Sequence, residues 1–180
     1  MIGFDETGLR RIGERVVAMI VERTLRGIDA EGRPMQPYST RTFAMPAGAL
    51  WAPGSRTAAR RLRQQGALRY FQRGGSLWVA IQGGYRTYKE ARFPGQGSEV
   101  NLTLTGSMMR SLSVREVRAD TRRAEIVIGF LRSEEAEKAY WHEVTGAGRS
   151  RVRRRFMGLT PDQLRALERE FLDAIRIRAV

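Results

Sequence analysis

The chain has 180 residues, enough for one ordinary domain with a sizeable core, and 42% of them are apolar, so a globally disordered chain is excluded. It contains no cysteine and one histidine, which excludes disulfides, thiolate metal sites, cysteine nucleophiles and most histidine-rich metal sites. There are 32 Lys and Arg against 19 Asp and Glu, a net charge of +13.

The positive charge is concentrated in two stretches that contain no acidic residue. One lies between Glu31 and Glu90 and the other between Glu143 and Asp162, and the rest of the chain is slightly negative. Charge of one sign that gathers in this way attracts a polyanion or a complementary acidic protein surface. The alternative is a solvated basic face that has no dedicated partner.

The first third of the chain predicts a helix followed by an extended segment. Asp5 or Thr7 can cap a helix over about 9–26, because apolar residues recur there at steps of three and four. Gly13 weakens this helix by about 1 kcal/mol relative to Ala. From Asp29 onward prolines and glycines are too frequent for a long element. We therefore expect a Pro/Gly-rich basic arm over 29–76 that docks on a partner, or alternatively folds back on its own domain.

The rest of the chain predicts strands and helices in alternation, with one long loop over 84–99. Strands are expected at 77–81, 113–118 and 125–130, the last two as a hairpin. Helices are expected at 55–65, after Gly106, from Ser133 to Gly146, and from Pro161 with Thr160 as its cap. The chain is thus expected to be one α+β domain, 1–180, with a small antiparallel or mixed sheet packed against N- and C-terminal helices.

Apolar positions on the predicted faces define an expected core: Ile12, Val16, Ile20, Trp78, Leu112, Val127, Leu167 and Phe171.

Motifs for catalysis or cofactor binding are weak. No phosphate-binding loop of the GxxxxGK[ST] type occurs, and the pairs Gly74-Gly75 and Gly83-Gly84 are typical of turns. His142 precedes Glu143 and could act as a base with a carboxylate partner, but a lone histidine without a nucleophile motif is more often structural. We therefore expect no catalytic, cofactor or metal site, and no enzyme.

Four segments occur in a fixed order along the chain. They are Asp29 to Ser39, Asn101 to Leu112 with its Thr105-Gly106 pair, Ile128-Gly129, and Ala139 to Gly146 leading into Arg153 to Thr160. Together they resemble the phage virion morphogenesis, or tail completion, proteins. The resemblance extends over about residues 9 to 175.

The resemblance implies a structural virion protein of a tailed phage or phage-like particle, which acts in tail completion and head–tail joining at the neck. It implies a homo-oligomeric ring, by analogy with tail tubes a hexamer, with the tail tube protein and head–tail connector proteins as partners. Assembly would take place in the host cytoplasm without a membrane partner, and non-specific contact with DNA in the channel stays open. No cofactor is implied.

Large apolar and arginine residues of the basic stretches are the expected partner contacts: Phe43, Leu50, Trp51, Tyr85, Tyr88, Arg149, Arg151, Arg153, Arg154 and Arg155. If the arginine segment is extended, Arg151, Arg153 and Arg155 point to one side and Val152 to the other. Acidic protein side chains are the favoured partner of these arginines, with DNA phosphates as the alternative. A basic nucleic-acid-binding protein is therefore the second hypothesis, and an enzyme acting through His142 and Glu143 a weaker third.

Overall fold

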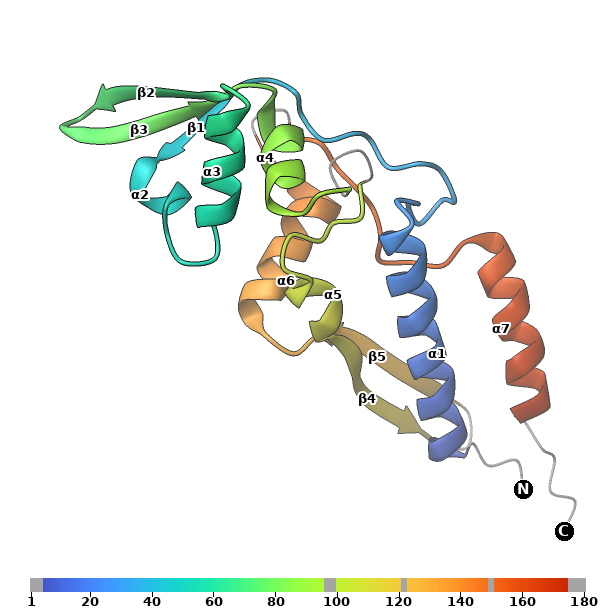
Figure 1. Ribbon diagram of the computed structural model, residues 1–180. Helices are drawn as coiled ribbons and strands as arrows, with labels where there is room; N and C mark the ends of the chain where they lie inside the picture. The colour runs from blue at the N-terminus through green and yellow to red at the C-terminus, as the bar shows by residue number, and fades with distance from the viewer. Residues whose placement is uncertain (1–4, 96–99, 121–122, 149–150, 175–180) are drawn as a thin grey trace, which may run out of the picture. The chain divides into compact units, whose positions relative to one another are not determined.

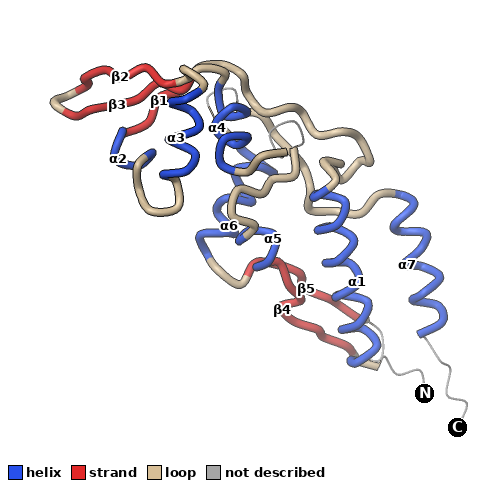
Figure 2. The backbone as a smooth tube through the Cα atoms, viewed as in Figure 1, coloured by secondary structure: helices blue, strands red, loops and turns tan. Residues whose placement is uncertain are grey.

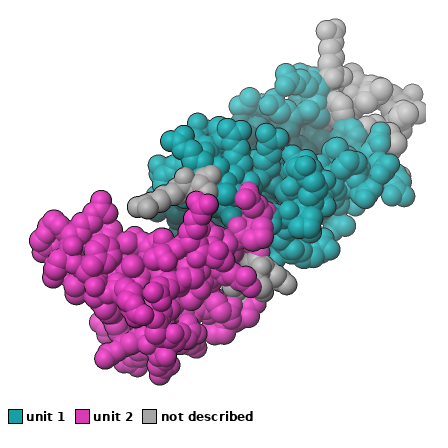
Figure 3. Space-filling view, turned by 90° about the horizontal axis from the view of Figure 1, so that it is seen from above, with its two compact units in different colours: residues 1–35, 101–180 teal, residues 36–100 magenta. Residues whose placement is uncertain are grey.

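The computed structural model describes residues 5–95, 100–120, 123–148 and 151–174. The chain divides into two compact units, unit 1 with residues 1–35 and 101–180, and unit 2 with residues 36–100 (Figure 3). Helices and strands occur in both units (Figure 1, Figure 2), and the predicted α+β class is confirmed. The sequence predicted one domain with an arm, whereas the structure has two units because the predicted arm folds into helices and strands of its own.

Unit 1 is built on a long N-terminal helix, α1 (Glu6–Leu25). The Asp5 side chain caps it by accepting a hydrogen bond from the Thr7 N–H at 3.0 Å. Its buried face carries Leu9, Gly13 and Ile20 at helical spacing. This face packs against a β-hairpin, and α1 also contacts the C-terminal helix (Figure 1).

The hairpin consists of β4 (Leu112–Ala119) and β5 (Ala124–Phe130), as the sequence predicted. The pairing is antiparallel, with a bulge between Val114 and Glu116. A short helix, α5 (Ser107–Ser111), precedes β4, while α6 (Ser133–Tyr140) and a π-helical turn, η1 (Trp141–Thr145), follow β5.

The C-terminal helix α7 (Pro161–Ala174) begins with a reciprocal cap. The Gln163 N–H donates to Thr160 Oγ1 at 3.3 Å, and the Thr160 N–H donates to Gln163 Oε1 at 3.0 Å. Gln163 Nε2 also donates to the Met19 carbonyl at 3.2 Å, which ties the start of α7 to α1.

Unit 2 contains a three-stranded antiparallel sheet in the order β1-β3-β2. The strands are β1 (Phe43–Pro46), β2 (Leu68–Arg73) and β3 (Ser76–Ile81), and the helices are α2 (Ala47–Leu50), α3 (Arg56–Gln64) and α4 (Gly84–Arg92). Helices α2 and α3 lie on the same side of this sheet, and the β2–β3 hairpin extends beyond them (Figure 1). Its core includes Leu50, Leu62, Val79 and Ile81, each with no exposed surface.

The predicted arm over 29–76 and the predicted long loop over 84–99 are corrected by unit 2. The breakers bound short elements instead of preventing them: Pro46 ends an edge strand, a position where proline costs no ladder hydrogen bond. Gly83 and Gly84, expected as a turn, have positive φ at the start of α4. A Cβ on Gly84 would lie 2.3 Å from the Ser39 carbonyl oxygen, so only glycine fits there.

The predicted core is confirmed in part. Ile20, Leu112 and Leu167 are buried. The other five are half-buried: Ile12, Val16, Trp78, Val127 and Phe171.

Candidate functional site

Most of the aromatic residues predicted as partner contacts lie inside unit 2. Leu50 is fully buried and Tyr88 is 6% exposed, so the prediction that they contact a partner is corrected. Phe43 and Tyr85 are half-buried and pack with Tyr88 and Tyr38, with ring centroids 5.2 to 6.4 Å apart. The physical reason is that α4, which the sequence did not predict, brings Tyr85 and Tyr88 against β1.

Lys89 lies beside this ring cluster. Its side chain has no exposed surface, its Nζ donates to the Tyr38 hydroxyl at 3.0 Å, and it lies 4.5 Å from the centre of the Tyr38 ring. Burial lowers the pKa of Lys89 to about 8. Lys89 is therefore a core residue of unit 2, and it is not part of the basic surface that the charge pattern predicted.

Trp51 is half-buried and borders an open hollow of unit 2. The hollow has a volume of about 490 Å³ and is lined by Trp51, Arg60, Arg63 and Gln64. Trp51 Nε1 donates to the Tyr70 hydroxyl at 3.2 Å, which joins the end of α2 to the β2–β3 hairpin. This hollow therefore combines one aromatic ring, that of Trp51, with two guanidinium groups on one surface.

The β2–β3 hairpin exposes three large apolar side chains. Tyr70, Phe71 and Leu77 are 46%, 39% and 48% exposed. Because the hairpin extends beyond the helices, its residues distant from Leu68 are covered on neither face. The sequence signal for this was the short glycine turn at Gly74-Gly75, which predicts a hairpin but not what covers it.

Exposure alternates along the arginine segment of unit 1, although Arg151 itself has a left-handed backbone with φ of 46° and is not extended. Arg151, Arg153 and Arg155 are exposed, while Val152 is half-buried. Arg154 lies on the inner side and is 7% exposed, so its assignment as a partner contact is corrected by the same alternation that exposes its neighbours. Arg149 lies outside the described residues.

Backbone groups hold the continuation of this segment in place. The Glu143 carboxylate accepts the N–H groups of Phe156 and Met157 at 2.5 and 2.6 Å, and the Arg154 N–H donates to the His142 carbonyl at 2.9 Å. Phe156 is fully buried and its ring centroid lies 6.4 Å from that of Phe130. Glu143, a candidate catalytic carboxylate, therefore anchors the backbone.

Arg23 of α1 completes this anchor. Its guanidinium donates to the carbonyls of Phe156 and Gly158 at 2.6 and 2.8 Å and to Gln163 Oε1 at 2.7 Å. Burial lowers the pKa of Arg23, and the nearby carboxylates, led by Asp29, oppose that shift. The side chain is 3% exposed, so these contacts are shielded from water.

His142 is a half-buried, neutral imidazole. Desolvation first and the charge of Arg154 second lower its pKa to about 4. Its Nδ1 is buried and has no hydrogen-bond partner among the residues that the structure describes. Since Glu143 is occupied by two backbone N–H groups, the structure does not bring these two residues together as an acid–base pair.

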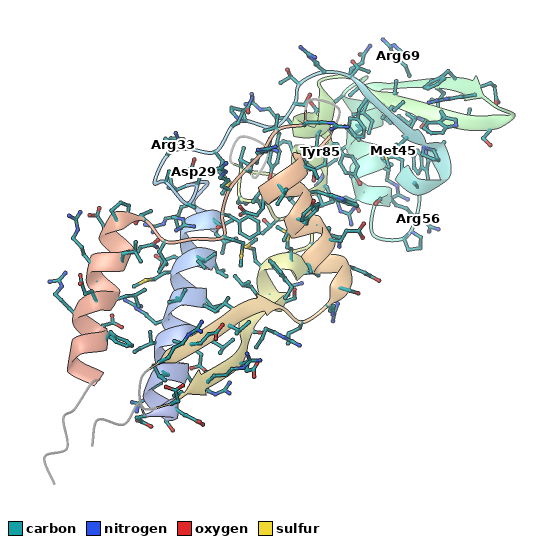
Figure 4. The ribbon with its side chains drawn as sticks, turned by 180° about the vertical axis from the view of Figure 1, so that it is seen from behind. Asp29, Arg33, Met45, Arg56, Arg69 and Tyr85 are labelled. Carbon is teal, nitrogen blue, oxygen red and sulfur yellow. The ribbon has the colours of Figure 1, made fainter. Side chains whose placement is uncertain are left out.

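The turn at Asp29 docks on the arginine segment. Asp29 Oδ1 accepts the N–H groups of Glu31 and Arg33 at 3.0 and 2.8 Å, and the turn is visible beside Arg33 in Figure 4. The Ala30 N–H donates to the Arg155 carbonyl at 2.8 Å. Segments far apart in sequence thus meet around the chain between Arg154 and Gly158.

An exposed apolar cluster, here called the Trp141 patch, lies on α6 and η1. It consists of Tyr140, Trp141 and Val144, which are 53%, 48% and 45% exposed. The opposite side of α6 carries the buried Glu135 and Ala139. Sequence reasoning predicted the helix but missed the patch, although helical spacing places these three residues away from Ala139.

Glu135 links α6 to α5. It is buried and accepts hydrogen bonds from Ser107 Oγ at 2.8 Å and Lys138 Nζ at 3.0 Å. Burial acts to raise the pKa of Glu135, but these two donors outweigh it and the net shift is downward.

Among the described residues, no group of three or more His, Asp or Glu side chains is placed to hold a metal ion. No helix in the described ranges has both the length and the apolar character needed to cross a membrane. Comparison with known proteins found no matching family model, no matching curated protein and no matching solved structure.

Proposed function

We propose that the protein is a structural component of a tailed phage or phage-like particle that acts in tail completion and head–tail joining at the neck. In this proposal several copies form a ring, by analogy a hexamer, between the tail tube and the head–tail connector proteins.

The arrangement of unit 1 supports this proposal. Two of the four segments that carry the family resemblance meet there. One is the turn at Asp29, and the other is the last segment, through His142 and Glu143 of η1 and the chain from Arg154 to Gly158. Their contacts are made largely by backbone groups and by Arg23. Residues that resemble the family therefore serve to build unit 1, as expected for a family whose members share a scaffold.

The observation that carries the proposal is the Trp141 patch. Three large apolar side chains on adjacent helical turns stay about half exposed in a chain of high net charge. Tryptophan and tyrosine are enriched at the centres of protein interfaces, where they are covered by a partner. A neighbouring copy of the same chain covers the patch in a ring, because each copy of a heterologous ring presents two different surfaces.

The mass of the purified chain tests this assignment. Six copies of the 20.4 kDa chain have a mass of about 122 kDa, which native mass spectrometry separates from the monomer. We expect that the double variant Trp141→Ser, Val144→Ser stays folded by circular dichroism, loses the ring and no longer joins heads to tails. If the free chain is monomeric, the same variant is added to tails of the particle that encodes it, and rings at the tail ends are counted by electron microscopy.

Leu164→Ser is the matched control, because Leu164 is an exposed apolar residue of α7 outside the patch, with 53% of its surface accessible. It should keep the wild-type ring. Rings that form equally well from the double variant would refute the role of the patch. A wild-type chain that forms no ring alone or on tails would refute the proposed function.

A further inference from the structure

The hollow beside Trp51 is a separate feature of unit 2 that the proposed function does not use. We infer that it is a binding site for single-stranded nucleic acid, in which Arg60 and Arg63 contact phosphates and the rings of Trp51 and Tyr70 stack on bases. This inference does not depend on the proposed function.

The guanidinium groups of the hollow are free to bind an anion. Arg60 and Arg63 lie one turn apart on the exposed side of α3, whose other side buries Ala58, Ala59 and Leu62. Neither arginine has a hydrogen bond or an ion pair within the part of the chain that the structure describes. Their charges are thus uncompensated by the protein, and phosphate groups can neutralise both.

The net charge of unit 2 as a whole favours a polyanion. Within the described residues of unit 2, Glu90 is the one acidic residue against ten Lys and Arg. Arg56, at the start of α3, adds a further guanidinium whose Nε donates to the Trp51 carbonyl at 3.3 Å. A single small anion would leave most of this charge unmatched, whereas a phosphodiester chain supplies one negative charge at each nucleotide.

The aromatic rings favour unpaired bases over an acidic protein segment or a duplex. Trp51 lines the hollow, and the hydrogen bond from its Nε1 to the Tyr70 hydroxyl restricts both side chains and places Tyr70 next to it. Restricted rings stack on bases with less further loss of side-chain freedom, and stacking requires a base face that a duplex does not present. The side-chain amide of Gln64, also in the lining, can donate to and accept from a base edge.

Binding of a fluorescein-labelled dT12 oligonucleotide to the full chain tests the site, measured by anisotropy at 50 and 200 mM NaCl. We expect the double variant Arg60→Gln, Arg63→Gln to bind at least about tenfold more weakly at the lower salt concentration. The slope of log affinity against log salt concentration should become less steep by about 1.4. This is the change expected when two phosphate contacts to a single strand are lost. Trp51→Leu should weaken binding by about 5- to 150-fold, the range for loss of one stacked base.

The face of the β2–β3 hairpin that lies opposite Tyr70 supplies matched controls. Strand alternation places Arg69 and Arg73 on the face opposite Tyr70, and Figure 4 shows Arg69 and Arg56 on opposite sides of unit 2. The double variant Arg69→Gln, Arg73→Gln removes the same charge as the test variant, and Phe71→Ser removes an exposed ring from that face. Both controls should change the affinity by less than about threefold.

Every other outcome overturns the inference. Equal losses in the test and control pairs would show general attraction to a basic surface. Equal affinity for a 12-base-pair duplex would exclude base stacking. If poly-glutamate binds more tightly than dT12 and the same variants lose that binding, the partner is an acidic protein. If dT12 does not bind at 50 mM NaCl, the hollow is not a nucleic-acid site. Ring formation by each variant is measured in parallel by native mass spectrometry. A failure of the nucleic-acid inference is therefore distinguishable from a failure of the proposed function.

Discussion

Gly13 gives a prediction whose sign differs between sequence and structure. From helix propensity alone, Gly13→Ala in α1 should stabilise the chain by about 1 kcal/mol. In the structure Gly13 is buried where α1 crosses the β4–β5 hairpin, and a Cβ there would lie 2.7 Å from both Val114 Cγ2 and Ile126 Cγ2. Both atoms belong to β-branched side chains with restricted χ1, so the contact cannot be relieved by a simple rotation.

Overpacking of this kind costs about 1 to 3 kcal/mol, which offsets or exceeds the gain in propensity. We therefore expect Gly13→Ala to lower the free energy of unfolding by about 1 kcal/mol, measured by urea denaturation monitored by circular dichroism. Adding Val114→Ala should reduce the cost of Gly13→Ala by about 1 kcal/mol, because it removes one of the two clashing methyl groups.

Gly8→Ala in the same helix is the control. The three atoms nearest to a Cβ on Gly8 would all belong to the Asp5 side chain, with Oδ2 the nearest at 3.3 Å. That exposed side chain can move, so this variant should be at least as stable as the wild type. Stabilisation of the chain by about 1 kcal/mol in Gly13→Ala, matching Gly8→Ala, would refute the close approach of α1 and the hairpin.

Two further predictions concern buried cations. Burial lowers the pKa of Lys89 from 10.5 to about 8. The unfolded chain therefore binds this proton more tightly than the folded chain does, and the free energy of unfolding should rise with pH between these two pKa values. From pH 7 to pH 9 the expected rise is about 1 kcal/mol. Urea denaturation at these pH values should show the rise in the wild type and in Lys138→Met but not in Lys89→Met, and an unchanged rise in Lys89→Met would contradict the assignment. Arg23→Lys should lower the free energy of unfolding by about 2 to 4 kcal/mol, because an ammonium group cannot reach all three acceptors of the guanidinium fork. Arg26→Lys, at an exposed position just after the same helix, is its control in thermal denaturation, and equal melting temperatures of the two variants would argue against the anchor.

Elements defined by local patterns were predictable from the sequence. The β4–β5 hairpin follows from two apolar runs and a turn containing Asp120, and α7 follows from Thr160, Pro161 and helical spacing. In unit 2 the sequence predicted α3 and β3 but not β1, β2, α2 or α4, because these four elements are four to nine residues long and are bounded by the same Pro and Gly that indicate an arm. The Tyr85, Tyr88 and Arg92 spacing of α4 was a helical signal that the glycines before it concealed.

Some residues predicted as partner contacts were wrong for a different reason. Composition does not show which large apolar side chains become buried within the chain. Leu50 and Tyr88 do so once α4 and the sheet form, and the Trp141 patch does not. Burial depends on contacts between residues that are far apart in the sequence, within unit 1 and within unit 2. No short window of sequence contains those contacts.

The charge pattern also overstated the surface available to partners, because several cations of the basic stretches have structural roles. Lys89 and Arg154 are buried, Arg61 donates to the Ala91 carbonyl, and Arg92 donates to Ser55 Oγ and the Tyr88 hydroxyl. In a chain with two lysines and one histidine, arginine supplies the long donors that join loops to helices. The basic surface that faces solvent is consequently smaller than the sequence indicates. It includes the outer side of α3 and alternate residues of the arginine segment. Contacts that depend on charge should therefore respond to substitutions at those two places more than to an equal change in net charge elsewhere.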